Sequence, residues 1–303
     1  MGAQKENLDC RFSFCAPKAT AGCIPSHSEV KIPKERPEGS ASDEDDSIAY
    51  FNTMEPKQII INESLISYAT AGRGDHSLIF LHGWRSNKEA WLPVTQLMEN
   101  AGYRLIFIDL PGFGSSETPK QPYTLHDYAQ TVRLFAEKLD LKVHAVIGHS
   151  AGARIAAKLA AEHPEFMDKL VLIASGGARP AFIKLKACLA KIAKPFFIPR
   201  FMTPLRKKLY AWIGAEDYLA TPDLQKTFVN VIKENLDQLL PQIKNDTLII
   251  WGEKDETAPL EYGKHMTRLI PNAHLEIIEN AGHYCFREQP QLFSGLIVRF
   301  IAL

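Results

Sequence analysis

Three residues that together could perform nucleophilic catalysis occur in this sequence in an informative order. Ser150 lies at the centre of a Gly-x-Ser-x-Gly motif, GHSAG, at residues 148–152. Asp255 follows the apolar segment TLIIW, and His283 follows the next apolar segment, LEII. A serine hydroxyl is a weak nucleophile unless a base removes its proton, and the base needs an acid that holds its tautomer. The order Ser, Asp, His therefore predicts Ser150 as nucleophile, His283 as base and Asp255 as the orienting acid.

Other acidic residues compete for the role of the acid. Glu253 and Glu256 flank Asp255, and we interpret both as solvated loop carboxylates. Asp109 also follows an apolar segment, LIFI, and there we expect a structural aspartate that is hydrogen-bonded within its loop. We interpret His149 as the variable residue of the Gly-x-Ser-x-Gly motif and expect most of the other histidines to have no part in the chemistry, which leaves His283 as the predicted base.

Acyl transfer needs two hydrogen-bond donors for the oxyanion that develops in the transition state, and these are usually backbone N–H groups. Ala151, the residue after the predicted nucleophile, is one candidate. Trp84, in the HGW motif that follows the apolar segment LIFL, is the other. Gly83 would let the backbone approach the site closely. The alternative interpretation of Gly83 and Trp84 is a simple turn with a packed indole ring.

The elements around these residues alternate between short apolar segments and helical patterns. Apolar residues recur at helical spacing over residues 125–139 and 150–163, and residues 59–69 alternate around a polar turn, as in an antiparallel hairpin at a sheet edge. This rhythm predicts an α/β fold with a doubly wound, mostly parallel sheet. The predicted parallel strands are LIFL (78–81), LIFI (105–108), HAVI (144–147), LVLI (170–173), TLIIW (247–251) and LEII (275–278).

This pattern places Ser150 at a nucleophile elbow between a strand and a helix. So sharp a turn forces a strained backbone on the serine and excludes bulky side chains two residues away on either side. It also exposes the hydroxyl at the carboxyl edge of the sheet and directs a helix N-terminus at the reacting group.

Composition divides the chain into parts. The first part is rich in proline and contains the acidic stretch SASDEDD, whereas the region between LVLI and TLIIW holds only helical patterns broken by prolines. We predict that residues 1–53 form a mostly disordered tail, with a docking peptide as the alternative. Residues 54–177 and 246–303 are predicted to form the α/β core, and residues 178–245 an inserted helical domain.

The predicted helical insertion has an unusual charge pattern. Nine basic residues and no acidic one lie within 179–208, beside apolar and aromatic residues at helical spacing. Such a helix could lie on an anionic membrane surface or steer an anionic substrate. We favour a third interpretation, in which its apolar face packs on the core and its lysines are solvated.

The remaining composition excludes several classes of protein. The 35 basic and 35 acidic residues balance, which argues against a nucleic-acid-binding protein. No apolar run is long enough to span a bilayer, and the N-terminus lacks the apolar stretch of a secretory signal, so we expect a cytoplasmic protein. The five cysteines lack zinc-site spacing and are expected to be free thiols. Nothing in the sequence predicts the oligomeric state.

The motifs HGW, DLPGFGSS, GHSAG, WGEKD and AGH, in this order, resemble the α/β-hydrolase superfamily over residues 57–303. The most similar members are small capped enzymes, namely esterases, lactonases, C–C bond hydrolases and cofactor-free haloperoxidases. This resemblance implies a helical cap over the site and no metal or organic cofactor. Epoxide hydrolases and haloalkane dehalogenases place an aspartate at the elbow, where this chain has Ser150.

We therefore expect a carboxylesterase-like serine hydrolase that cleaves an ester-like acyl bond of a small to medium, apolar substrate through an acyl-enzyme. One alternative keeps the triad and changes the chemistry, to C–C bond hydrolysis of a diketone-type acid or to acyl transfer. The second alternative is a non-catalytic ligand receptor.

Overall fold

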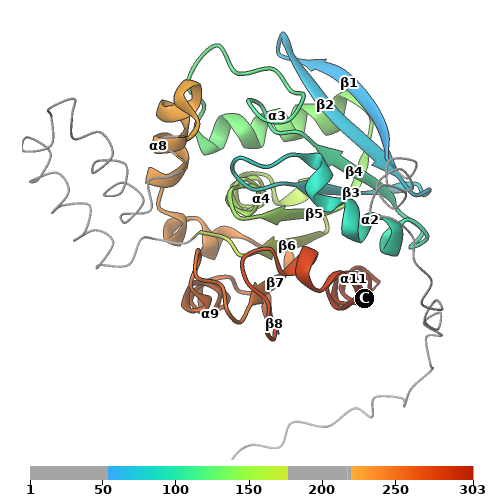
Figure 1. Cartoon of the computed structure of the whole chain (residues 1–303), viewed down its shortest axis with the longest axis vertical. Coiled ribbons are helices and arrows are strands. Elements are labelled where there is room, and N and C mark those ends of the chain that lie inside the picture. The colour runs from blue at the N-terminus through green and yellow to red at the C-terminus, as the bar shows by residue number, and fades with distance from the viewer. Residues whose placement is uncertain (1–53, 177–216, 218–219, 303) are drawn as a thin grey trace, which may run out of the picture. The chain divides into compact units, whose positions relative to one another are not determined.

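The computed structural model describes residues 54–176, 217 and 220–302 (Figure 1). These belong to the larger of two structural units, Ser42–Leu303. The predicted tail, 1–53, and the basic segment, 179–208, lie outside the described residues, and the predicted cap is described only at residue 217 and from residue 220 onward.

An eight-stranded sheet forms the centre of the described unit, in the order β1-β2-β4-β3-β5-β6-β7-β8. All neighbouring strands from β4 to β8 are parallel, which confirms the predicted α/β class and mostly parallel sheet. Each predicted parallel strand is present, extended by one or a few residues. The bounds are β3 His76–Leu81, β4 Arg104–Ile108, β5 Lys142–His149, β6 Lys169–Ile173, β7 Asp246–Gly252 and β8 Ala273–Ile278.

The predicted hairpin forms the first edge of this sheet. Strands β1 (Glu55–Ile61) and β2 (Ser64–Ala71) pair antiparallel, and β2 also pairs antiparallel with β4. The turn residues Asn62 and Glu63 both have positive φ, 48° and 64°. Positive φ at both turn residues is typical of the tight hairpin turn that matches the twist of the strands.

Helices cover the sheet on both sides. Figure 1 shows α3 (Leu125–Lys138) and α4 (Ala151–Glu162) together on one side, and α2 (Leu92–Met98) and α11 (Pro290–Ile301) together on the other. A capping box formed by Thr124 and Asp127 starts α3. The other described α-helices are α8 Gln225–Lys233, α9 Leu260–Leu269 and α10 Cys285–Glu288. Short 3₁₀ helices are labelled η, and those described are η1 Lys88–Trp91, η2 Pro164–Phe166, η5 Pro222–Leu224, η6 Leu236–Gln238 and η7 Leu240–Gln242.

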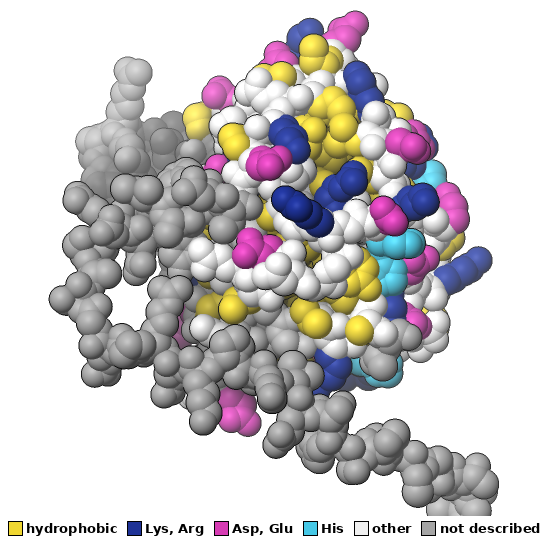
Figure 2. Space-filling model, turned by 90° about the vertical axis from the view of Figure 1, so that its right-hand side faces the viewer, with side chains coloured by type: hydrophobic (Ala, Val, Ile, Leu, Met, Phe, Trp, Pro, Cys, Tyr) yellow, Lys and Arg dark blue, Asp and Glu magenta, His cyan; other side chains and the backbone are white. Residues whose placement is uncertain are grey.

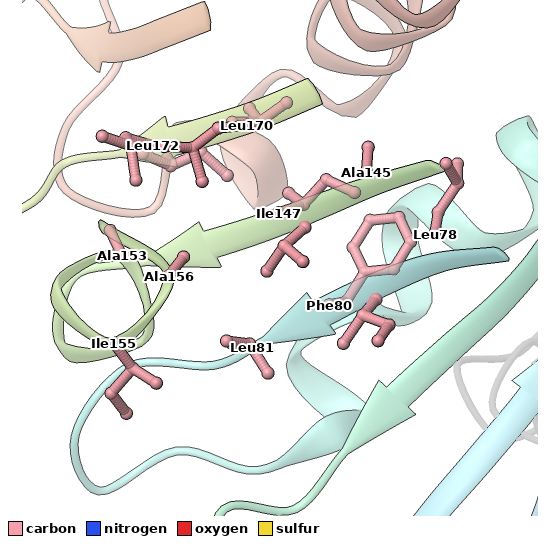
Figure 3. Packing of buried hydrophobic residues seen from close by; sticks show 14 of the residues in the cluster. Leu78, Phe80, Leu81, Ala145, Ile147, Ala153, Ile155, Ala156, Leu170 and Leu172 are labelled. Atoms are coloured by element: carbon pink, nitrogen blue, oxygen red, sulfur yellow. The ribbon is translucent and has the colours of Figure 1, made fainter. Parts of the chain in front are cut away.

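Strands β3, β5 and β6 lie next to one another in the middle of the sheet. Figure 3 shows their apolar side chains beside α4, whose small residues Ala153 and Ala156 allow the helix to lie close to the strands. Because helices cover both faces, successive residues of these strands are buried, which explains their continuous apolar sequences. The core therefore holds β5 and α4, the two elements that flank Ser150, in fixed relation.

The surface carries mixed charge. On the face in Figure 2, Lys and Arg side chains are interspersed with Asp and Glu among smaller apolar areas. This mixture agrees with the equal numbers of acidic and basic residues in the chain.

Candidate active site

Ser150 occupies a strained backbone conformation between β5 and α4. Its φ and ψ are 52° and −108°, and its N–H donates to the carbonyl of Ile173 over 2.9 Å. The flanking glycines are required by space. A Cβ on Gly148 would lie 2.4 Å from the carbonyl oxygen of Gly152, and a Cβ on Gly152 would lie 2.3 Å from that of Leu81. Strain of this kind persists only where the surrounding structure enforces it, as it does at functional sites.

The proposed base and acid are in contact. Nδ1 of His283 lies 2.7 Å from Oδ2 of Asp255, whose side chain is fully buried. The other carboxylate oxygen, Oδ1, accepts the backbone N–H groups of Thr257 and Ala258, each at 2.8 Å. The carboxylate is therefore held by its own loop while it faces the imidazole.

The loops that carry these two residues are joined through their backbones. The N–H of Lys254 donates to the carbonyl of Ala281 over 2.8 Å. A Cβ on Gly252 would lie 2.2 Å from the carbonyl oxygen of Gly282, so only glycine allows this approach. Because β7 and β8 are neighbouring parallel strands, their loops leave the sheet at the same edge.

The competing glutamates lie elsewhere. Glu253 is exposed and accepts the backbone N–H of Asn280 over 3.0 Å, and Glu256 is also exposed. Asp109 is fully buried and accepts the backbone N–H of Lys88 (2.7 Å), its Nζ (2.7 Å) and the N–H of Ser115 (2.9 Å). Asp109 thus has the structural role that its sequence context predicts, between the loops that follow β3 and β4.

His149, the residue before Ser150, contacts His283, the residue proposed as the base, and no sequence motif indicated this contact. Its Nε2 lies 2.9 Å from the carbonyl oxygen of His283, and the two rings are 4.8 Å apart. A carbonyl only accepts, so Nε2 carries the proton. Burial, together with the neighbouring His283, lowers the pKa of His149 to about 3 and keeps the ring neutral. Its place beside Ser150 was the only signal in the sequence.

The hydroxyl of Ser150 and the ring of His283 make no hydrogen bond to each other in the described structure. Such bonds between nucleophile and base often shorten only when substrate binds. Gly83 packs against Ser150. A Cβ on Gly83 would lie 3.3 Å from Cβ of Ser150 and 2.9 Å from Nδ1 of His149.

The two candidate oxyanion donors, Ala151 and Trp84, line the same pocket. Ala151 is the first residue of α4, where backbone N–H groups lack helical partners and the helix dipole favours negative charge. Trp84 follows β3, in a loop that buried His82 holds. Nδ1 of His82 donates to the carbonyl of Gly83 over 2.7 Å, and Nε2 accepts the N–H of Leu110 over 3.0 Å. Burial lowers the pKa of His82 to about 4, so it stays neutral in both bonds.

The pocket beside Ala151 is narrow and apolar. The only hydroxyl in its lining, that of Tyr128, donates to the carbonyl of Pro111 over 3.1 Å. Phe228 of α8 packs on Trp84 at 5.1 Å between ring centroids, so α8 borders the same region. The lining residues are Gly83, Trp84, Leu110, Phe113, Tyr128, Ala151, Ile155 and Val231.

The described residues contain no group of three His, Cys, Asp or Glu side chains placed to hold a metal ion. Among the helices of the described ranges, none has the length and apolar character needed to cross a membrane.

Comparison with known proteins agrees with this fold. Residues 78–296 match the model of the alpha/beta hydrolase family. A 2-hydroxy-6-oxononadienedioate/2-hydroxy-6-oxononatrienedioate hydrolase of Pseudomonas sp is 28% identical, over 77% of this chain and 90% of the relative. The AB hydrolase superfamily protein YisY of Bacillus subtilis is 30% identical, over 74% of this chain and 90% of the relative.

A solved structure, the esterase from Exiguobacterium antarcticum, superposes with a TM-score of 0.64 at 24% identity, covering 83% of this chain and 99% of that one. At that identity the likeness concerns the fold. The family model, in contrast, spans most of the chain, including the elbow and the loops after β7 and β8. The chain therefore belongs to the alpha/beta hydrolase family.

Proposed function

We propose that this hydrolase cleaves an ester-like acyl bond through an acyl-enzyme on Ser150, with His283 as base and Asp255 as the acid that orients it. The observation that carries the proposal is the contact of 2.7 Å between His283 and a buried carboxylate, beside a strained serine at a helix N-terminus. A hydrogen bond from Nδ1 to Asp255 leaves Nε2 of the imidazole available to accept the serine proton.

In the first half of this mechanism, Oγ of Ser150 attacks the carbonyl carbon while Nε2 of His283 takes the hydroxyl proton. Asp255 stabilises the imidazolium that forms. The carbonyl electrons move onto oxygen, where the backbone N–H groups of Trp84 and Ala151 donate hydrogen bonds. When the carbonyl re-forms, the C–O bond to the leaving group breaks, and His283 protonates the departing alkoxide.

In the second half, water attacks the ester carbon of the acyl-enzyme. His283 takes a proton from the water, the same N–H groups stabilise the oxyanion, and the bond to Oγ breaks with return of the proton to Ser150. The products are a carboxylic acid and an alcohol, and the protein is regenerated.

The apolar pocket supports a small to medium, uncharged acyl group as the substrate class. Its lining offers no charged side chain, and its one hydroxyl, on Tyr128, already donates to the backbone. Burying a charged group there would cost free energy without compensation. We further propose that the segment 178–245 covers this pocket as a cap, since α8 within it supplies Val231 to the lining.

A second candidate is hydrolysis of a C–C bond in a diketone-type acid. The name of the Pseudomonas relative, a hydrolase of an oxo-dioate, favours it. A dioate carries two carboxylates, and these require cationic partners that the described apolar pocket lacks. This candidate therefore depends on the basic residues of 179–208.

Initial hydrolysis rates distinguish the two candidates. The substrates are p-nitrophenyl esters from acetate to laurate and a 2-hydroxy-6-oxo-dienedioate, and each is measured with wild type and with Ser150→Ala. The proposal expects ester turnover, with the rate reduced by about 10⁴-fold or more in Ser150→Ala. Turnover of the dioate alone would establish the C–C candidate. Failure of both substrates, together with failure of a fluorophosphonate to label Ser150 in folded protein, would establish a non-catalytic receptor.

A further inference from the structure

Arg154 is a buried arginine on α4, one helical turn after Ser150. Its side chain contacts three backbone carbonyls that come from distant parts of the sequence. Nη1 donates to Gly176 over 2.5 Å, and Nη2 donates to Val231 over 3.0 Å and to Glu234 over 2.7 Å. Nε is also 3.3 Å from the carbonyl of Val231. The residue is only 6% exposed.

One of these carbonyls lies just before the predicted cap insertion, and the other two lie within its C-terminal part. Gly176 follows β6, just before the insertion begins, while Val231 and Glu234 lie at the C-terminal end of α8, where the chain returns toward the core. The last carbonyls of a helix lack helical partners, and a cation near them is stabilised by the helix dipole. A planar guanidinium can serve several carbonyls at once, which an ammonium group cannot do in the same geometry.

The hydrogen bond to Val231 connects Arg154 with the apolar pocket. Arg154 holds the carbonyl of Val231, and the same residue lines the apolar pocket together with Ala151 and Ile155 of α4. Arg154 and the pocket residues Ala151 and Ile155 belong to the same helix, α4, and Ser150 directly precedes it. The guanidinium therefore joins α4 to Val231, whose side of the pocket we call the Val231 wall.

We propose that Arg154 is a positioning residue that holds the Val231 wall at a fixed distance from Ser150 and so determines which acyl chains the pocket accepts. The inference rests on the proposed ester hydrolysis and deepens it. The hydrogen bonds of Arg154 to Gly176, Val231 and Glu234 all go to backbone carbonyls, and one of these residues lines the pocket, so we expect its effect to fall on binding of the acyl chain.

Lys158, the next residue on this face of α4, supports the same segment from the outside. Its Nζ lies 2.7 Å from Oε1 of Glu234 and 3.1 Å from Oε1 of Glu162, and its side chain is 13% exposed. Removing Lys158 leaves the guanidinium in place but loosens the segment that Arg154 holds. Loss of Lys158 should therefore change selectivity in the same direction as loss of Arg154, by a smaller factor.

The test is the ratio of kcat/KM for p-nitrophenyl octanoate to that for the acetate. In Arg154→Lys we expect this ratio to fall about tenfold, which corresponds to the loss of one hydrogen bond from a charged donor. The change should appear as a higher KM for octanoate, with kcat for acetate retained. Arg299→Lys is the matched control, because Arg299 is exposed on α11 and pairs only with Glu276 among its described contacts.

A double-mutant cycle separates positioning from general stability. If Arg154 acts through the pocket wall, the effects of Arg154→Lys and Val231→Ala on the selectivity ratio will not add, because the second change removes the side chain that the first displaces. If Arg154→Lys does not fold, Lys158→Met provides the same measurement. An unchanged ratio in folded Arg154→Lys, or in Lys158→Met where it replaces that variant, would overturn the inference, as would additive effects in the cycle.

Labelling rates with an ethyl and a decyl fluorophosphonate distinguish this inference from the proposed function. Both probes require a reactive Ser150 but no ester substrate. Absence of labelling in wild type would refute the proposed function. Normal labelling in wild type with the same decyl-to-ethyl preference in Arg154→Lys would refute only the positioning role.

Discussion

Nδ1 of His283 lies 2.7 Å from one oxygen of Asp255, while the other oxygen accepts two backbone N–H groups at 2.8 Å each. The loop therefore orients the carboxylate independently of the histidine. In Asp255→Asn the amide oxygen can still accept the backbone N–H groups, which places the NH₂ group against Nδ1. The imidazole must then carry its proton on Nε2, where it cannot act as a base.

For Asp255→Asn we therefore expect ester hydrolysis to fall by about 10⁴-fold, with little change in melting temperature. The measurement is kcat for p-nitrophenyl butyrate beside a thermal melt. Glu253→Gln and Glu256→Gln are the controls, and both should retain the wild-type rate because these side chains are exposed. A loss in Glu253→Gln as large as that in Asp255→Asn would transfer the role of the acid to Glu253.

The buried histidines predict how stability depends on pH. The pKa of His149 falls from 6.5 to about 3 on folding, and that of His82 falls from 6.5 to about 4. Between pH 6.5 and these values the unfolded chain binds protons that the folded protein does not. Stability is thus full above pH 6.5 and decreases as the pH falls, by up to about 1.4 kcal/mol per pH unit for each histidine.

Urea unfolding at pH 7, 6 and 5 measures this slope. His149→Gln should reduce the slope of stability against pH by the contribution of one histidine. The glutamine amide can still donate to the carbonyl of His283, but it does not titrate. The same slope in wild type and in His149→Gln would contradict a neutral, buried His149.

The space available for a Cβ predicts opposite effects for substitutions of two glycines, one at the elbow and one in α11. A Cβ on Gly152 would meet the carbonyl oxygen of Leu81 at 2.3 Å, and backbone cannot move aside cheaply. We expect Gly152→Ala to lose at least about 3 kcal/mol of stability or to fail to fold. Gly295, an exposed position inside α11, has no atom within 4 Å of a Cβ, so Gly295→Ala should gain about 0.5–1 kcal/mol. Chemical denaturation of both variants gives the comparison.

The buried ion pair between Lys88 and Asp109 predicts a large loss of stability. Burial opposes the charge on Lys88, but hydrogen bonds to Asp109 and Glu89 outweigh it and raise the pKa of Lys88. In Lys88→Met the carboxylate of Asp109 would stay buried without its cation, at a cost of about 3–5 kcal/mol. The exposed pair of Lys264 and Glu261 is the control, and Lys264→Met should cost less than about 1 kcal/mol. Equal losses in the two variants would contradict this account.

Much of the fold could be predicted because the parallel strands carry continuous apolar sequences, which few other structures produce. Several helices were harder to predict. The helices η1, α2, α9 and α11 were not predicted, because their apolar residues become distinctive only once the faces of the sheet that they cover are known. The elbow, in contrast, follows from glycines whose spacing reflects a local steric requirement.

For the site, local motifs indicated which residues lie at strand ends but not which partners hold them. The roles of His149 and His82 depend on carbonyl and N–H groups of other loops, and no local pattern encodes those contacts. Arg154 was missed for the same reason, since its partners lie 22, 77 and 80 residues away. From helical spacing alone, Arg154 is simply a polar residue on a mostly apolar helix.

The position of β8 at the edge of the sheet suggests an order in which heating disables the protein. Among the strands that the structure describes, β8 pairs only with β7, and it is one of the less buried strands, with Ile277 41% exposed. The loop that follows it nevertheless carries His283. Ser150, in contrast, follows the central strand β5. Edge elements open at lower free-energy cost than the core. Warming should therefore separate the proposed base from its serine while the rest of the sheet is intact, giving heat inactivation that reverses on cooling and precedes global unfolding.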